Sequence, residues 1–192
     1  MLHPCLSLRV TVFASHDAAN PERNIIGIPK DTDSHRAAAK KVLEVLPKAP
    51  YELICTSREA EYIKVAGNAF LFLKVIYANL MFDASKAQGC DWEIIRQALS
   101  ADSRIGPSHL GVLHASGHPG AKPGRGAGGH CLVKDFAALR MQYEKVFPED
   151  KAGAAVFKAL ECKNINLLME SEKDIDLLKG VYGDDPRSTC AS

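Results

Sequence analysis

One cysteine, one lysine and one aspartate stand together after a run of glycines in the second half of the chain. The run, Gly124–Gly129, holds four glycines in six residues. Glycines let a backbone adopt crowded or left-handed conformations, so the run predicts that a ligand approaches the main chain here. Because a basic neighbour favours the nucleophilic thiolate, Lys134 makes Cys131 a candidate nucleophile, and Asp135 could orient a water or a base.

The same residues allow a plainer interpretation. Cys131 could be a small apolar filler in the first turn of a helix that follows a surface loop, because free cysteines are commonly buried. The run also spells G-x-G-x-x-G, a dinucleotide-binding fingerprint that requires a hydrophobic strand directly before it. Residues 116–123 contain two prolines and two glycines, which a central strand does not tolerate, so we assign no dinucleotide site to this run.

The longest predicted element is a helix over residues 57–88. Its middle is apolar on almost all sides, so a bundle or a dimer partner must cover it. The expected dimer contacts are Phe70, Phe72, Leu73, Ile76 and Leu80. A polar stripe, defined by Lys64, Asn68 and Asn79, returns to nearly the same side of this helix. Because buried polar groups need partners, the polar stripe predicts contact with a ligand, a partner or a solvated cleft, and the alternative is a solvated helix edge.

Shorter elements flank this helix. Before it, a strand, a helix and a strand look like the tail of a larger α/β sheet, over residues 24–28, 33–46 and 51–56. Asp33 or Ser34 is the expected cap of the first helix, Asp91 that of the helix after residue 90, and Ser171 that of the last. Helices are predicted after residue 90 over residues 91–99, 136–146, 148–169 and 171–180.

The loop over residues 108–129 is rich in glycine, proline and histidine, and long loops of this kind are usually functional or disordered. Four histidines lie in or beside it, without fixed spacing and without carboxylate partners, so we assign no metal site. These histidines are His109, His114, His118 and His130.

Composition limits the classes of function. The 192 residues suffice for one domain, or for one domain and a fragment of another. With 24 Lys and Arg against 23 Asp and Glu, we expect no nucleic-acid partner. The start does not fit a signal peptide, and no run of about 18 apolar residues occurs, so we expect no membrane segment. Six widely spaced cysteines argue against zinc and fit a reducing, cytoplasmic location.

Three motifs occur in one order along the chain, namely Glu61-x-x-Lys64-x-x-x-Asn68, Asp102-Ser103-Arg104-Ile105-Gly106 and Gly128-Gly129-x-Cys131-x-x-Lys134-Asp135. Together they resemble the UDP-glucose/GDP-mannose dehydrogenases over about residues 20–140. The resemblance implies oxidation of the C6 alcohol of a nucleotide sugar, such as UDP-glucose, to a carboxylate. It implies NAD as the cofactor, and a cysteine-bound thiohemiacetal and thioester as intermediates.

The resemblance also implies roles for single residues. Cys131 would be the nucleophile, Lys64 and Asn68 would stabilise the developing oxyanion, and Asp135 would help activate the hydrolytic water. Arg104 would reach across a homodimer toward the partner's sugar nucleotide. The substrate-binding residues implied in this way are Arg104, Gly128, Gly129 and Lys134.

The chain departs from the family pattern in three respects. Only what looks like the last strand, helix and strand of an NAD-binding domain is recognisable, and no C-terminal nucleotide-sugar domain follows. No true nucleotide fingerprint remains. His130 stands where UDP-glucose enzymes typically carry serine, whereas Lys134-Asp135 is similar to the UDP-glucose branch, so the sugar stays open.

These observations predict a mainly α fold: a helical central domain built on a long dimerisation helix, preceded by a small α/β remnant of a Rossmann-type domain. The expected division is 1–56 for the remnant, 57–183 for the helical domain and 184–192 for a polar tail. The favoured function is the cysteine-bearing central domain of a nucleotide-sugar 6-dehydrogenase, inactive as an isolated chain or working with a separate NAD-binding chain. The alternative is a non-catalytic helical dimerisation module.

Overall fold

The computed structural model describes residues 19–190, and its fold is 62% helical with one small sheet, which confirms the mainly α fold class. The chain divides into two compact units, Met1–Gly67 and Asn68–Ser192, and the division lies inside one long helix. Cys5 and the other residues of the first 18, together with residues 191–192 of the predicted tail, lie outside the described residues. The domain limits at residues 56 and 183 stay predictions.

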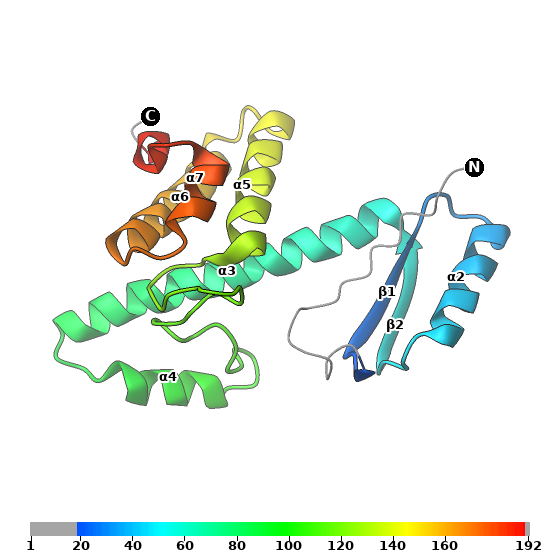
Figure 1. The fold of residues 1–192 in the computed structure, drawn as a ribbon, viewed down its shortest axis with the longest axis horizontal. Coiled ribbons are helices and arrows are strands. Elements are labelled where there is room, and N and C mark those ends of the chain that lie inside the picture. Colours follow the sequence, from blue (N-terminus) through cyan, green and yellow to red (C-terminus); the bar gives the residue numbers. More distant parts are fainter. Residues whose placement is uncertain (1–18, 191–192) are drawn as a thin grey trace. The chain divides into compact units, whose positions relative to one another are not determined.

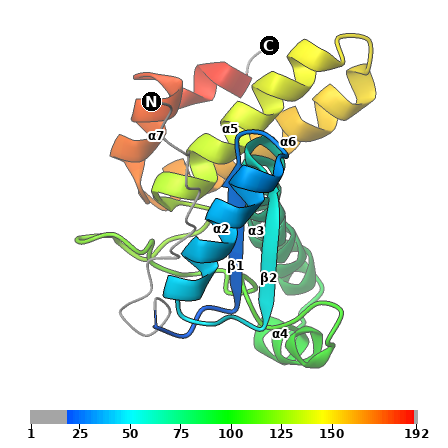
Figure 2. The ribbon, with the colours of Figure 1, turned by 90° about the vertical axis from the view of Figure 1, so that its right-hand side faces the viewer.

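The first unit contains a two-stranded parallel sheet, in which β1 (Arg23–Ile28) pairs with β2 (Tyr51–Thr56) from Arg23 opposite Tyr51 to Ile28 opposite Thr56. Helix α2 (Asp33–Val45) packs on it (Figure 2). The contact buries apolar side chains of both layers, namely Ile26, Ile28, Ala39 and Leu43. The predicted cap of α2 was wrong: Thr32 is the N-cap, and its hydroxyl accepts from the backbone N–H of His35.

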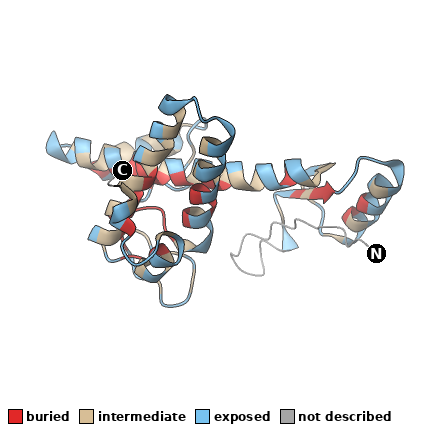
Figure 3. Ribbon diagram, turned by 90° about the horizontal axis from the view of Figure 1, so that it is seen from above, coloured by how far each residue is buried: buried red, intermediate tan, exposed pale blue. Residues whose placement is uncertain are grey.

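Helix α3 (Ser57–Ala87) confirms the long helix expected from the sequence. Buried residues gather on the part of α3 that belongs to the second unit, where α5 and α6 cover it (Figure 3). The core there consists of Ala69, Phe72, Val75, Ile76, Ala127, Phe136 and Leu167, and the rings of Phe72 and Phe136 stack at 3.9 Å. A cover supplied by the chain's own helices therefore accounts for one side of α3.

Helix α3 is also long and apolar enough to cross a membrane by length and composition, with a mean hydropathy of 1.5 over 18 residues. The sequence-based expectation of no membrane segment stays a prediction, because one helix that meets this criterion is weak evidence for a membrane span. The core helix of a soluble protein passes the same test, and 39% of this window is buried inside the structure. Because α3 carries the core described above, we treat it as a core helix.

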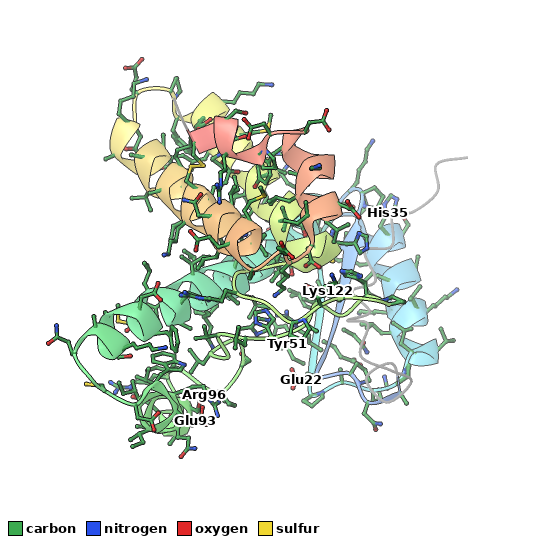
Figure 4. The ribbon with its side chains drawn as sticks, turned by 60° about the vertical axis from the view of Figure 1, so that its left-hand side comes forward. Glu22, His35, Tyr51, Glu93, Arg96 and Lys122 are labelled. Carbon is green, nitrogen blue, oxygen red and sulfur yellow. A yellow bond between two sulfur atoms is a disulfide. The ribbon has the colours of Figure 1, made fainter. Side chains whose placement is uncertain are left out.

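Helix α4 (Trp92–Ala101) begins after Asp91, whose carboxylate accepts from the backbone N–H of Glu93, as predicted. Glu93 and Arg96 lie side by side on this helix, where Arg96 Nε donates to Glu93 Oε2 at 2.8 Å (Figure 4). The loop that follows α4 is held by one isolated antiparallel bridge between His114 and Gly124. The apolar face of α4 packs with the end of α3 and with this loop, through Ala78, Trp92, Leu110 and Val112.

Helices α5 (Gly129–Val146), α6 (Lys151–Glu170) and α7 (Ile175–Tyr182) pack together beside the second part of α3 (Figure 1). Two sequence-based predictions about where helices begin were wrong. α5 begins at Gly129 rather than after Asp135, and Ser171 ends α6 instead of capping the last helix. Asp174, in the left-handed conformation at φ 54°, is the residue that precedes α7.

The C-terminal segment is not only a polar tail, because η1 (Pro186–Cys190) forms a 3-10 helix that contacts α6 and α7. A disulfide joins Cys190 to Cys162 of α6. This bond differs from the reducing location that the spacing of the cysteines suggested. The sequence did not indicate the pairing, because the two residues are 28 positions apart and meet only through the packing of η1 on α6.

Candidate functional site

Cys131 lies in the first turn of α5 as an exposed, free cysteine. Gly128 is the N-cap residue and Gly129, at φ +80°, begins the helix. The interpretation of Cys131 as a buried apolar filler was therefore wrong in burial, although its place in the first turn was right. An exposed thiol at the amino end of a helix is open to a substrate and lies in a partly positive environment.

Asp135 follows Cys131 by four residues, so the two side chains lie on the same side of α5. The Asp135 side chain is only 8% exposed, and two donors hold its oxygens. Asn68 of α3 donates its amide N–H to Oδ2 at 2.5 Å, and Lys134 Nζ donates to Oδ1 at 2.5 Å. The structure therefore brings Asn68, Lys134 and Asp135 together beside the turn that carries Cys131.

Lys134 has a carboxylate partner in the structure, because its ammonium pairs with Asp135. The effect of this ammonium on Cys131, which the sequence suggested, stays a prediction. A carboxylate that accepts from an amide and from an ammonium keeps a fixed orientation, which a group that orients water requires. The Lys134 side chain is 52% exposed, so it is also accessible to solutes.

Two further candidates form ion pairs within their own segments. Lys64 belongs to the first compact unit, where its ammonium lies 3.9 Å from Glu61 and its side chain is 32% exposed. Arg104 lies in the loop after α4, with an 88% exposed side chain whose guanidinium pairs with Asp102 at 2.6 Å. Their assigned roles stay predictions.

The glycine run packs against the chain itself. A Cβ at Gly124 would lie 2.7 Å from Lys173 Cβ, and a Cβ at Gly128 would clash with the Asp174 carboxylate. The close approach that the glycines predicted therefore takes place, but the group that approaches is the junction between α6 and α7. Sequence reasoning missed this junction because residues 45 or more positions apart meet there.

Lys173 and Asp174 are buried at this junction. Lys173 is fully buried and donates from Nζ to the Gly126 carbonyl at 3.0 Å, and burial lowers its pKa to about 8. Burial raises the pKa of the Asp174 carboxyl, but hydrogen bonds from Ser116, His118 and the Gly129 N–H outweigh it and hold the pKa below its ordinary value. The hydrogen bond to Asp174 raises the pKa of His118.

The polar stripe has an internal partner at Asn79. The Asn79 side chain is fully buried, and Asn79 Oδ1 accepts from Arg125 Nε at 2.8 Å. Arg125 also pairs with Asp83 at 2.7 Å and lies over the ring of Phe82. Arg125 thereby anchors the glycine run to α3. A solvated helix edge is the wrong interpretation for Asn68 and Asn79, which are 4% and 0% exposed.

Residues 19–190, which the structure describes, do not fit a dinucleotide. The only glycine fingerprint of the sequence lies in the run whose spaces are taken by Lys173 and Asp174, which leaves no cradle for a pyrophosphate. Residues 19–190 contain no group of three or more His, Cys, Asp or Glu side chains that could hold a metal. Within those residues, the candidate site consists of Cys131 and the cluster of Asn68, Lys134 and Asp135.

Comparison with known proteins gives one family. Residues 58–164 match the central domain of the UDP-glucose/GDP-mannose dehydrogenase family. The chain is 37% identical over 129 residues to UDP-glucose 6-dehydrogenase TuaD of Bacillus subtilis, covering 66% of this chain and 24% of that protein. It is 30% identical over 151 residues to UDP-glucose 6-dehydrogenase of Pseudomonas aeruginosa, covering 79% and 30%.

The fold has a solved relative as well. A UDP-glucose dehydrogenase from the hyperthermophilic archaeon Pyrobaculum islandicum is similar with a TM-score of 0.64 and 27% identity, over 88% of this chain and 34% of that one. The chain thus spans about a quarter to a third of the length of these relatives.

Proposed function

Because the chain belongs to the UDP-glucose/GDP-mannose dehydrogenase family, we propose that it is the cysteine-bearing central domain of an NAD-dependent UDP-glucose 6-dehydrogenase-like enzyme. One observation carries this proposal: the exposed thiol of Cys131 stands one turn before Asp135, whose carboxylate is held by Asn68 and Lys134. A nucleophile beside an oriented carboxylate is what acyl transfer through a thioester requires.

Bound NAD would accept the two hydrides that leave C6, the first of which converts the alcohol to an aldehyde. In this proposal the Cys131 sulfur attacks that aldehyde carbon of the sugar nucleotide. The carbonyl oxygen becomes an oxyanion, which amide and ammonium donors stabilise, and we assign these roles to Asn68 and Lys64. After oxidation to the thioester, Asp135 accepts the proton of the attacking water, and the carboxylate product leaves Cys131. Gly128, Gly129, Lys134 and Arg104 are assigned to binding of the nucleotide sugar, with Arg104 acting on the partner of a homodimer.

The hydride acceptor is NAD in this proposal, and the described residues do not hold it. We therefore assign NAD binding to a further domain or to a separate chain, and we expect residues 1–192 alone to be inactive.

A second function has its own support. Exposed apolar side chains on α3, at Phe70, Leu73, Tyr77 and Leu80, suit a non-catalytic helical dimerisation module.

A chimera tests the proposal against this alternative. Residues 20–183 replace the matching region of the Bacillus subtilis relative, and NADH formation is followed with UDP-glucose. We expect turnover that Cys131→Ala lowers at least about a thousandfold, because a covalent nucleophile has no substitute. Cys90→Ala, which removes another exposed thiol, is the matched control and should leave the rate unchanged. A folded but inactive chimera favours the dimerisation module, and an active Cys131→Ala variant contradicts the proposed nucleophile.

A further inference from the structure

The first turn of α5 has no capping side chain of its own, because its N-cap residue is Gly128. A distant carboxylate takes that place: the backbone N–H of Gly129 donates to Asp174 Oδ2 at 2.7 Å, across 45 residues of sequence. A side-chain oxygen that accepts from the first amides of a helix is what an N-cap residue supplies. Asp174 therefore caps α5 from the junction between α6 and α7.

Gly128 makes this remote cap possible. A Cβ at that position would clash with the Asp174 carboxylate and would lie 2.7 Å from Ser116 Oγ. Ser, Thr, Asp or Asn at position 128 would cap the helix locally, but each carries a Cβ and would displace Asp174. A local cap and the Asp174 cap exclude each other, and the chain uses the remote one.

Asp174 is itself the N-cap residue of α7, yet its side chain makes no capping hydrogen bond there. Its carboxylate accepts instead from Ser116 Oγ and from His118 Nε2 at 2.9 Å, as well as from Gly129. The side chain is 1% exposed, and φ is +54°, a conformation that non-glycine residues adopt at a cost. The backbone at Asp174 thus directs the carboxylate away from its own helix and onto α5.

We propose that Asp174 is a positioning residue for Cys131: its carboxylate caps α5 and ties that helix to the Ser116 and His118 loop, which fixes the turn that presents the thiol. The role of Cys131 as a nucleophile rests on the proposed function. The cap that Asp174 forms on α5 does not depend on that function. A capped first turn holds the Cys131 backbone in one helical conformation, and an uncapped one frays. A frayed turn would present the thiol in many orientations, whereas the capped turn presents it in one.

Three variants of the full chain test this inference without substrate or cofactor. Asp174→Ala removes the acceptor, Asp174→Asn keeps one acceptor oxygen, and Asp176→Ala removes an exposed carboxylate from the first turn of α7 as a matched control. The readouts are amide hydrogen exchange, and the ¹³Cα chemical shift of Cys131, which reports its helical conformation. In Asp174→Ala we expect at least about tenfold faster exchange at Gly129 and Val133, and a Cys131 shift toward the unfolded value.

A role confined to general stability would accelerate exchange equally in α6, for example at Ile165, and would not be rescued by asparagine. The inference predicts local acceleration, rescue in Asp174→Asn and no change in Asp176→Ala. Should Asp174→Ala fail to fold, Ser116→Ala removes one donor to the carboxylate, and we expect faster exchange at Gly129 alone. Unchanged exchange and an unchanged Cys131 shift in Asp174→Ala, or in Ser116→Ala where that variant replaces it, overturn the inference. Because these measurements use no substrate, an inactive chimera would contradict the proposed function without changing the result expected here.

Discussion

At the scale of single residues, the described cysteines differ in access and in surroundings. Cys131 and Cys90 are exposed free thiols, Cys162 and Cys190 form a disulfide, and burial, with the nearby charge of Glu59, raises the pKa of the half-buried Cys55. Only Cys131 of these lies in the first turn of a helix, where the partial positive charge attracts an anion. We expect iodoacetamide to label Cys131 fastest in the native chain.

Peptide mapping at several reaction times measures these labelling rates. Cys90 is the natural internal control, because it is equally free and exposed but lies in the turn between α3 and α4. Faster labelling of Cys90 than of Cys131 would remove the case for a prepared nucleophile.

Lys173 gives a pH-dependent prediction at the same scale. Burial lowers its pKa from 10.5 to about 8 in the folded chain, so between these pH values the unfolded chain binds more protons. The free energy of unfolding should therefore rise with pH across this window, by up to about 3 kcal/mol. Lys173→Met should flatten that rise. Urea unfolding at about pH 7.5, 9 and 10.5, which spans the window, measures the free energy of unfolding of both proteins. An equal dependence of that free energy on pH in wild type and Lys173→Met would contradict the assigned burial effect.

At the scale of elements, the disulfide fixes η1 on α6. A cross-link that closes a loop of this length restricts the unfolded chain, so Cys190→Ser should lower the free energy of unfolding by about 2–4 kcal/mol under oxidising conditions. Reduction of the wild-type chain should cause a loss of the same size, and Cys90→Ser should cause none. Denaturant unfolding with and without dithiothreitol measures these differences. Equal stability of oxidised and reduced wild type would show that the bond adds nothing.

Local patterns predicted the elements well, because each pattern depends on residues within a turn or two. The period of apolar residues gave α3 almost to its ends, and Asp91 correctly marked the start of α4. The caps of α2 and α7 were wrong locally, whereas the wrong predictions around the glycine run involve contacts between distant residues. Asp174 holds Gly129 across 45 residues, so the start of α5 and the role of Asp174 have no local signal. The same reason hid the disulfide and the packing of the junction between α6 and α7 against the glycine run.

At the scale of the whole molecule, the sequence lacks a phosphate-binding turn that follows a strand, so residues 1–192 as an isolated polypeptide should not bind NAD. Calorimetric titration measures this, with a complete nicotinamide-dependent dehydrogenase in the same buffer as the positive control. A saturable dissociation constant in the micromolar range would contradict the expectation. It would also overturn the conclusion that the glycine run leaves no room for a pyrophosphate.

The last prediction concerns self-association through α3. Its expected dimer contacts included Phe72 and Ile76, but the structure buries these two against the chain's own helices, at 1% and 0% exposure. In the part of α3 that belongs to the second unit, four other apolar side chains remain exposed by 37–62%, namely Phe70, Leu73, Tyr77 and Leu80. Their spacing of three and four residues places them along one side of the helix. Burying each is worth about 1.5–3 kcal/mol, so a second copy of this surface is a favourable cover.

Size exclusion with light scattering should therefore give twice the chain mass of 20.8 kDa at tens of micromolar chain. Phe70→Asp or Tyr77→Asp should return the mass to that of one chain, because a charge in the contact is left without water. Ile94→Asp is the matched control, since Ile94 is 69% exposed on α4 and outside the α3 surface. A wild-type chain with the mass of a monomer at that concentration would show that this surface of α3 does not pair two copies.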